Sequence, residues 1–164
     1  MLQDLSLLLT RELDALRREI ELYPSDDALW TALPGLPNTG GTLVLHLAGN
    51  LRHFIGGVLG GSGYRRDRDA EFNQRGVTRS ELLALVAEAR SEVVLALDRV
   101  SPEQLAARFP QAVGGRAMST SLFLTHLLAH LAYHLGQIDY HRRASTGDAV
   151  SVNALPLSPL GDPA

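Results

Sequence analysis

The stretch Thr120-Ser-Leu-Phe-Leu-Thr-His126-Leu-Leu-Ala-His130-Leu-Ala-Tyr-His134-Leu-Gly-Gln137-Ile-Asp-Tyr-His141-Arg-Arg decides the fold of this chain. Its leucines predict a helix over about residues 120–144, begun at Ser119 or Thr120 and closed by Arg142, Arg143 and Gly147. Successive helix positions turn by about 100°. Four histidines and Gln137 therefore share one face of a helix that is otherwise rich in leucine.

Three further helices are predicted from the spacing of apolar residues, over about 2–22, 40–59 and 79–99. The last of these has a capping box in Thr78 and Glu81. A short helical turn follows at Ser101-Pro102. The sequence thus predicts an all-α protein, a four-helix bundle with one long crossover connection from Gly60 to Gly76. We expect residues 1–147 to form the bundle domain and residues 148–164 a C-terminal tail.

The composition excludes several classes of chemistry. All 15 basic residues are arginine, so a Schiff-base lysine and a P-loop are ruled out. No cysteine is present, which excludes disulfides and thiolate metal ligands. The net charge of -3 argues against nucleic-acid binding. Since neither a signal peptide nor a stretch of about 20 apolar residues is apparent, we expect a cytoplasmic protein with no membrane contact.

Histidines occur on two of the predicted helices. His46 and His53 are seven residues apart on the second, and His126, His130 and His134 follow at steps of four on the last. A pair of histidines one helical turn apart can chelate one ion, and bundles build metal sites from facing helices. Spacing alone does not choose between the pair 126/130 and the pair 130/134. His141 is interpreted as structural, since a cation in the last turn interacts favourably with the helix dipole.

The last helix resembles the signature of the DinB-like superfamily, which ends in His-x-x-x-His-x-Gly-Gln-Ile. The superfamily consists of four-helix bundles and includes YfiT-like metal-dependent hydrolases and thiol-dependent transferases. The resemblance implies that His46, His130 and His134 bind a metal. Leu135 departs from the pattern, because many members carry arginine there. The segment Arg66-Asp-Arg-Asp-Ala-Glu-Phe72 is similar to an Arg-Asp-x-Glu-Phe segment in one branch of the superfamily.

Three imidazoles suit a divalent transition ion, and zinc or nickel is favoured. Three protein ligands leave a position open, which is the condition for catalysis. The leading hypothesis is therefore a metal-dependent hydrolase acting on a small molecule. A thiol-dependent transferase and a non-catalytic, stress-associated metal-binding bundle are the alternatives. His126, Gln137 and His53 are candidates for supporting the ligands or lining a substrate pocket, and no catalytic base is predicted.

Two surface features also lead to expectations. The mixed charges of Arg65 to Asp69 are typical of a solvated face. The alternative is that salt bridges shape this segment into a rim over the metal or a subunit contact. The resemblance to the superfamily implies a homodimer, because many of its members are dimers. Apolar residues outside the main stripes of the first and last helices support this expectation, namely Leu7, Leu8, Leu122, Leu124 and Leu128. The alternative is that the tail beyond Gly147 folds back over this surplus within one chain.

Overall fold

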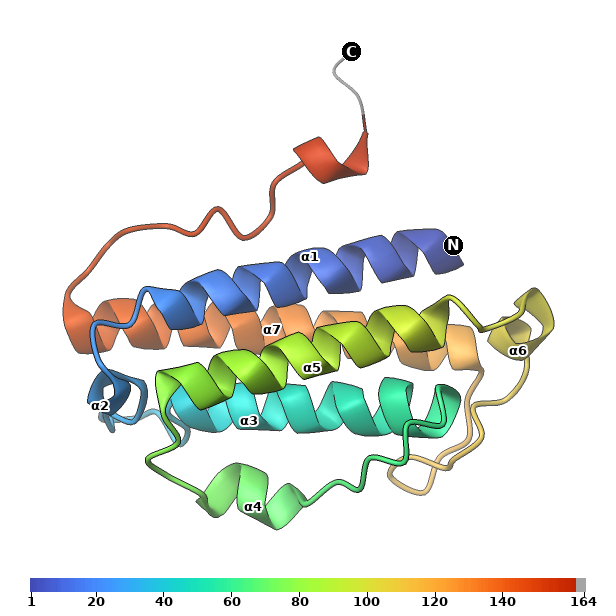
Figure 1. Ribbon diagram of the computed structural model, residues 1–164, viewed down its shortest axis with the longest axis horizontal. Helices are drawn as coiled ribbons and strands as arrows, with labels where there is room; N and C mark the ends of the chain where they lie inside the picture. Colours follow the sequence, from blue (N-terminus) through green and yellow to red (C-terminus); the bar gives the residue numbers. More distant parts are fainter. Residues whose placement is uncertain (162–164) are drawn as a thin grey trace.

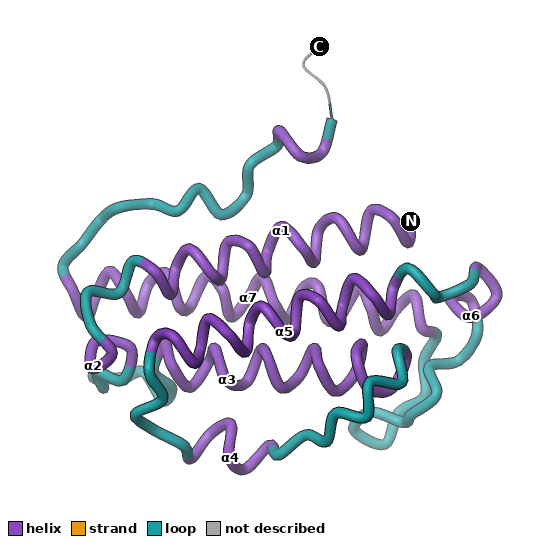
Figure 2. Tube along the Cα trace, viewed as in Figure 1, coloured by secondary structure: helices purple, strands orange, loops and turns teal. Residues whose placement is uncertain are grey.

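A computed structural model describes residues 1–161 as a bundle of four long helices (Figure 1). These are α1 (Leu2–Glu21), α3 (Gly40–Leu51) continued by the π-helix η1 (Arg52–Leu59), α5 (Arg79–Leu97) and α7 (Thr120–Thr146). The short elements are α2 (Asp26–Leu29), α4 (Arg68–Asn73), α6 (Pro102–Ala106) and the 3-10 turn η2 (Ser158–Leu160). Apart from isolated bridge pairs, residues 1–161 contain no β-structure (Figure 2). The predicted all-α bundle is confirmed.

The four long helices pack as neighbours around one apolar core. Helix α1 packs against α5 and α7, and α3 packs against the same two helices. The leucine stripe of α1 is fully buried at Leu9, Leu13 and Leu16, and α7 contributes Phe123 and Leu131 to the same core. Among the described residues, no helix has the length and apolar character needed to cross a membrane.

Side-chain caps fix where the helices begin. The capping box of Thr78 and Glu81 starts α5, as predicted. Ser101 caps α6, with Pro102 at its first position. At the start of α7 the Ser119 side chain accepts a hydrogen bond from the Leu122 backbone N–H. Gly147 ends α7 with φ at 73°, a conformation that favours glycine.

The second predicted helix changes character at Arg52, where α3 passes into the π-helix η1. Its glycines allow a close approach to α5. A Cβ on Gly60 would lie 2.7 Å from the Ala96 Cβ, and one on Gly56 would collide with the Glu92 side chain. A larger residue at either position would push the two helices apart.

The crossover from Gly60 to Gly76 is not irregular throughout, because it contains α4. This short helix was not predicted. It begins at Asp67, whose carboxylate accepts a hydrogen bond from the Ala70 backbone N–H. Helix α4 packs against α3 along one side of the bundle (Figure 1).

The tail beyond Gly147 runs back along the bundle, and arginine side chains bind its carbonyl groups. Arg142 Nη2 donates to the Val150 carbonyl at 2.6 Å, and Arg143 Nη1 to the Ala149 carbonyl at 2.6 Å. Arg18 of α1 donates to the Val152 carbonyl at 3.3 Å. Hydrogen bonds from arginine side chains to main-chain carbonyls therefore hold the first part of the tail against α1 and α7.

The apolar surplus expected to lie outside the core is smaller than predicted. Leu124 is completely buried in the core of its own chain, so it contributes nothing to an outer surface. Leu8 and Leu128 are half-buried. Leu7 and Leu122 remain exposed, at 40% and 59%.

Candidate metal centre

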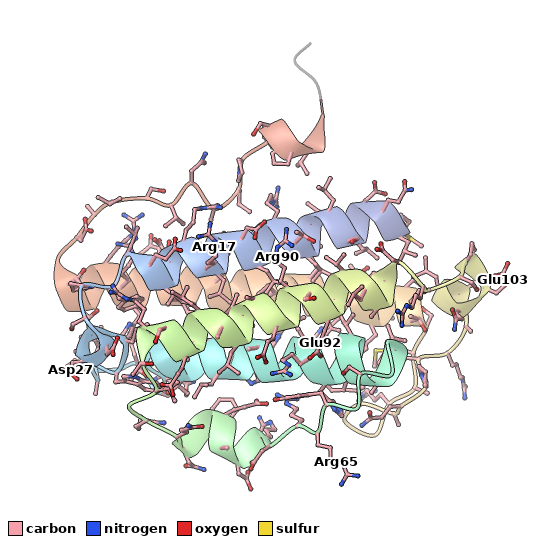
Figure 3. All side chains as sticks on the ribbon, in the orientation of Figure 1. Arg17, Asp27, Arg65, Arg90, Glu92 and Glu103 are labelled. Carbon is pink, nitrogen blue, oxygen red and sulfur yellow. The ribbon has the colours of Figure 1, made fainter. Side chains whose placement is uncertain are left out.

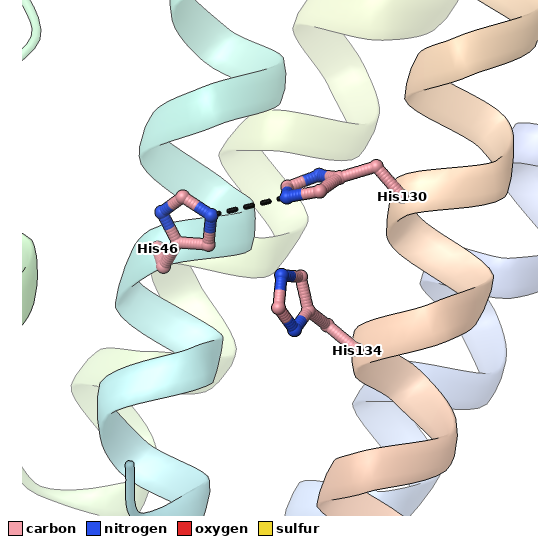
Figure 4. Close-up of side chains that lie close together, drawn as sticks. All are labelled: His46, His130 and His134. Atoms are coloured by element: carbon pink, nitrogen blue, oxygen red, sulfur yellow. Dashed lines mark hydrogen bonds between the residues drawn. The ribbon is translucent and has the colours of Figure 1, made fainter. Parts of the chain in front are cut away.

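Three histidine side chains from α3 and α7 meet on one side of the bundle (Figure 4). The ligand atoms of His46, His130 and His134 all lie within 4.8 Å of one another. His46 Nε2 and His130 Nε2 are 3.2 Å apart, and the rings of His130 and His134 lie edge to face with centroids 4.5 Å apart. The structure thus brings together the pair 130/134, with His46 from the facing helix.

Hydrogen bonds determine which nitrogen of two of these rings is free. His46 Nδ1–H donates to Glu71 Oε2 at 3.0 Å, and His134 Nδ1–H donates to Gln137 Oε1 at 2.6 Å. Each ring then keeps Nε2 as the atom with a lone pair. Such outer partners fix the tautomer and orientation of a metal-binding histidine.

The crossover supplies an ion pair behind His46. Arg66 Nε and Nη2 donate to the two carboxylate oxygens of Glu71 at 2.6 and 2.7 Å. Both side chains are largely buried, with 13% and 6% of their surfaces exposed. The ring of Phe72 packs on His46 with centroids 4.8 Å apart. Helix α4 therefore holds the ring of His46 in place.

The prediction of a solvated face for this segment is wrong at Arg66, which turns toward Glu71. The adjacent Arg65 points away from the bundle, as Figure 3 shows. A mixed run of charges does not reveal which member faces inward. Glu71 was not predicted as part of the site. The available signal was the similarity of the Arg66–Phe72 segment to one branch of the superfamily.

Burial keeps the imidazoles of His130 and His134 neutral. Burial, together with the neighbouring His134, His46, His126 and Arg66, lowers the pKa of His130 to about 4. Burial also lowers the pKa of His134. Burial opposes ionisation of Glu71, but hydrogen bonds from Arg66 and His46 outweigh it and leave the pKa of that carboxyl below its usual range. At pH 7 the site therefore combines the neutral rings of His130 and His134 with an ionised carboxylate behind His46.

This arrangement fits a divalent transition ion. Imidazole nitrogens suit zinc, nickel and related ions, and three of them lie close to one small volume. The carboxylate behind His46 and the amide behind His134 are the kind of support that metal-binding histidines have. His130 lacks such support, since its buried Nδ1 has no hydrogen-bond partner in the described part of the chain.

The other candidates lie outside the cluster, and Gln137 alone contacts a member of it by a hydrogen bond. His126 is exposed, and its ring is parallel to that of His130 with centroids 6.2 Å apart. His53 packs on Phe54. Within residues 1–161 neither ring joins the three clustered histidines.

His141 has a structural place, but not as a cation. It is 1% exposed; its Nδ1 accepts from the Tyr23 hydroxyl at 2.8 Å, and its Nε2–H donates to the Thr31 carbonyl at 2.9 Å. Burial lowers its pKa. The expected interaction of a charged ring with the helix dipole is therefore replaced by two hydrogen bonds of a neutral ring.

Leu135, the departure from the superfamily pattern, does not approach the histidines. Its side chain is 3% exposed and lines a pocket with Glu12 and Glu19 of α1.

Comparison with solved structures gives the same class of fold. A crystal structure of a DinB-like protein from Bacillus cereus ATCC 10987 is similar to the chain with a TM-score of 0.67 and 20% sequence identity. The similarity covers 87% of this chain and 92% of that one. The chain therefore has a DinB-like all-helical fold, as the resemblance in the last helix implies.

The sequence also matches, over residues 9–156, the family described as "Protein of unknown function (DUF1572)". The chain belongs to this family, which is DinB-like. No curated protein matches the sequence.

Proposed function

We propose that this protein is a metal-dependent hydrolase of small molecules, with His46, His130 and His134 binding one divalent ion, zinc or nickel. The observation that carries the proposal is the convergence of three imidazoles from two helices. Among residues 1–161, no fourth histidine or carboxylate completes the set. A site with three protein ligands leaves room for a substrate or water, whereas structural sites are closed by a fourth ligand.

Neighbouring side chains orient two of the three imidazole rings. Glu71 and Gln137 accept the Nδ1 hydrogens of two ligands and direct their Nε2 atoms inward. The positive charge of Arg66 balances the negative charge of Glu71, so this buried carboxylate stays ionised. A divalent ion bound here would supply Lewis-acid catalysis. The proposal assigns no catalytic base.

Hydrolysis can be tested with the protein loaded with zinc or nickel and assayed on a panel of activated esters and amides. We expect turnover at least 100-fold above that of the metal-free protein, and its loss in His46→Ala. His53→Ala, a histidine outside the cluster, is the matched control and should retain activity. If turnover requires an added low-molecular-weight thiol, the protein is a thiol-dependent transferase and not a hydrolase. A loaded protein inert with and without thiol would favour the non-catalytic bundle.

The role assigned to Glu71 can be tested by Glu71→Gln. An amide keeps the size of the side chain but removes the charge that holds His46 and Arg66. We expect the affinity for zinc to fall by about 10- to 100-fold. Titration calorimetry measures this, with Asp69→Asn, an exposed carboxylate on the same helix, as the control. Equal affinities for Glu71→Gln and the wild type would remove Glu71 from the site.

We further propose that the protein is a homodimer, supported by the exposure of Leu7 and Leu122. A two-fold pairing is the commonest closed assembly for an apolar surface. Light scattering at micromolar concentration should give twice the chain mass of 17.7 kDa. Leu122→Glu should shift the protein toward monomer. If the wild-type mass is that of one chain, the protein is a monomer and the proposed dimer is wrong.

A further inference from the structure

A small pocket lies next to the three histidines, because Gln137, which lines it, forms a hydrogen bond with His134. Its volume is about 140 Å³, and its walls include Leu36, Pro37, Leu43, Tyr140 and His141. Leu43 precedes His46 by three residues on α3, and Gln137 of the same pocket follows His134 by three residues on α7. The pocket is therefore displaced by about one helical turn from the ligand atoms.

The walls are mostly apolar, and Asn38 and Gln137 contribute amide side chains. Leu43 is 3% exposed and forms the base. His141 adds an uncharged ring, because both of its nitrogens are occupied by Tyr23 and Thr31. Leu36 and Tyr140 are exposed, at 47% and 75%, so the pocket can be entered from solvent.

Gln137 connects this pocket with the histidine cluster. Its Oε1 accepts the hydrogen bond from His134, so its amide nitrogen keeps both hydrogens as donors. No other side-chain hydrogen bond of Gln137 is formed within residues 1–161. A ligand that extends from the cluster into the pocket passes a donor before it reaches the apolar walls.

We propose that this pocket binds the apolar group of the substrate, and that the substrate carries a compact aromatic or branched aliphatic group next to a hydrogen-bond acceptor. The inference rests on the proposed metal site and adds the substrate class to it. The volume matches a single ring, since an engineered apolar cavity of about 150 Å³ binds benzene. The Gln137 amide would donate to the acceptor that joins the ring to the reacting group.

Two hydroxamates test the proposal by binding alone. Acetohydroxamate offers a metal-binding group with a methyl, and phenylacetohydroxamate offers the same group with a ring on one methylene. Titration calorimetry on the zinc-loaded protein should show that phenylacetohydroxamate binds about tenfold more tightly or better, because the ring leaves water for apolar walls.

Leu36→Asp tests whether the pocket causes this difference. The variant places a charge in an exposed wall of the pocket and should abolish the preference while leaving acetohydroxamate binding unchanged. Leu95→Asp is the matched control, because Leu95 is 53% exposed on α5 and does not line the pocket; it should keep the preference.

The outcomes separate the two proposals. Equal binding of the two hydroxamates, or a preference that survives Leu36→Asp, would overturn the pocket and leave the metal site standing. A loaded protein that binds neither compound would overturn both, since the ion would then lack an open position. A protein that takes up neither zinc nor nickel would overturn the proposed function, and the pocket with it.

Discussion

The variant in which His130 and His134 are both replaced by alanine is expected to lose stoichiometric binding of zinc or nickel. Removing two of three ligands leaves His46 alone, and one imidazole does not hold an ion against dilution. Metal analysis after purification without a polyhistidine tag measures the loss. His126→Ala is the matched control, because His126 lies on the same helix but outside the cluster, and it should retain one ion per chain. A double variant that keeps a full equivalent of metal would contradict the site.

The melting temperature also distinguishes the wild type from the double variant when metal is added. An ion that binds only the folded chain stabilises it by about 2.7 kcal/mol when its free concentration is 100 times its Kd. For a chain of this size that corresponds to a rise of about 5–10 °C in melting temperature. The double variant should show no rise. Helical circular dichroism should survive a chelator in both proteins, because the leucine core does not depend on the ion. Unfolding in the chelator would mean that the metal is required for the fold itself.

The long helices could be predicted from the sequence because their signals are local. Apolar spacing and caps such as Thr78 with Glu81 depend on residues within a few positions of one another, and the structure places those helix ends within a few residues of the prediction. Helix α4 could not be predicted in this way, because its six residues are too few for a periodic pattern. Its Asp67 cap could have been recognised, but a charged loop with a capping residue is common.

The candidate site could be predicted only in part, because only some of its contacts join residues that are close in the sequence. His130 and His134 are one turn apart on one helix, so their proximity follows from the sequence. Their meeting with His46 depends on how α3 and α7 pack, and only the resemblance to the superfamily implied it. Glu71 acts on His46 across the crossover, and no spacing along the chain predicts that contact. His141 shows the opposite case, since it shares the helical face but lies nearly three turns from His130 and binds Tyr23 instead.

A second polar cluster, between α1 and α7, illustrates how little a pattern of charges says about burial. Arg142 and Glu19 are 0% and 1% exposed at their side chains, and Arg142 Nε donates to Glu19 Oε2 at 2.6 Å. In the sequence, Arg142 and Arg143 look equivalent as cations closing a helix. In the structure, Arg142 lies inside, and Arg143 keeps 30% of its side chain exposed.

Arg142→Met is therefore expected to destabilise the protein by about 3–5 kcal/mol, because it leaves the carboxylate of Glu19 buried without its partner. Burial already raises the pKa of Glu19, and Arg142 is the group that opposes this effect. The variant also removes the hydrogen bond to the Val150 carbonyl that holds the tail. Urea denaturation of the metal-free protein measures the change in the free energy of unfolding.

Arg143→Met is the matched control. Arg143 pairs with Asp139 near the surface, and such pairs contribute about 1 kcal/mol or less. The double variant Glu19→Met with Arg142→Met separates loss of attraction from burial of an unpaired charge. If the unpaired carboxylate causes the loss, the double variant is more stable than Arg142→Met, because two apolar side chains leave no buried charge. A double variant as unstable as Arg142→Met would assign the loss to the other partners of Arg142, since Asp139 and the Val150 carbonyl lose their donor equally in both.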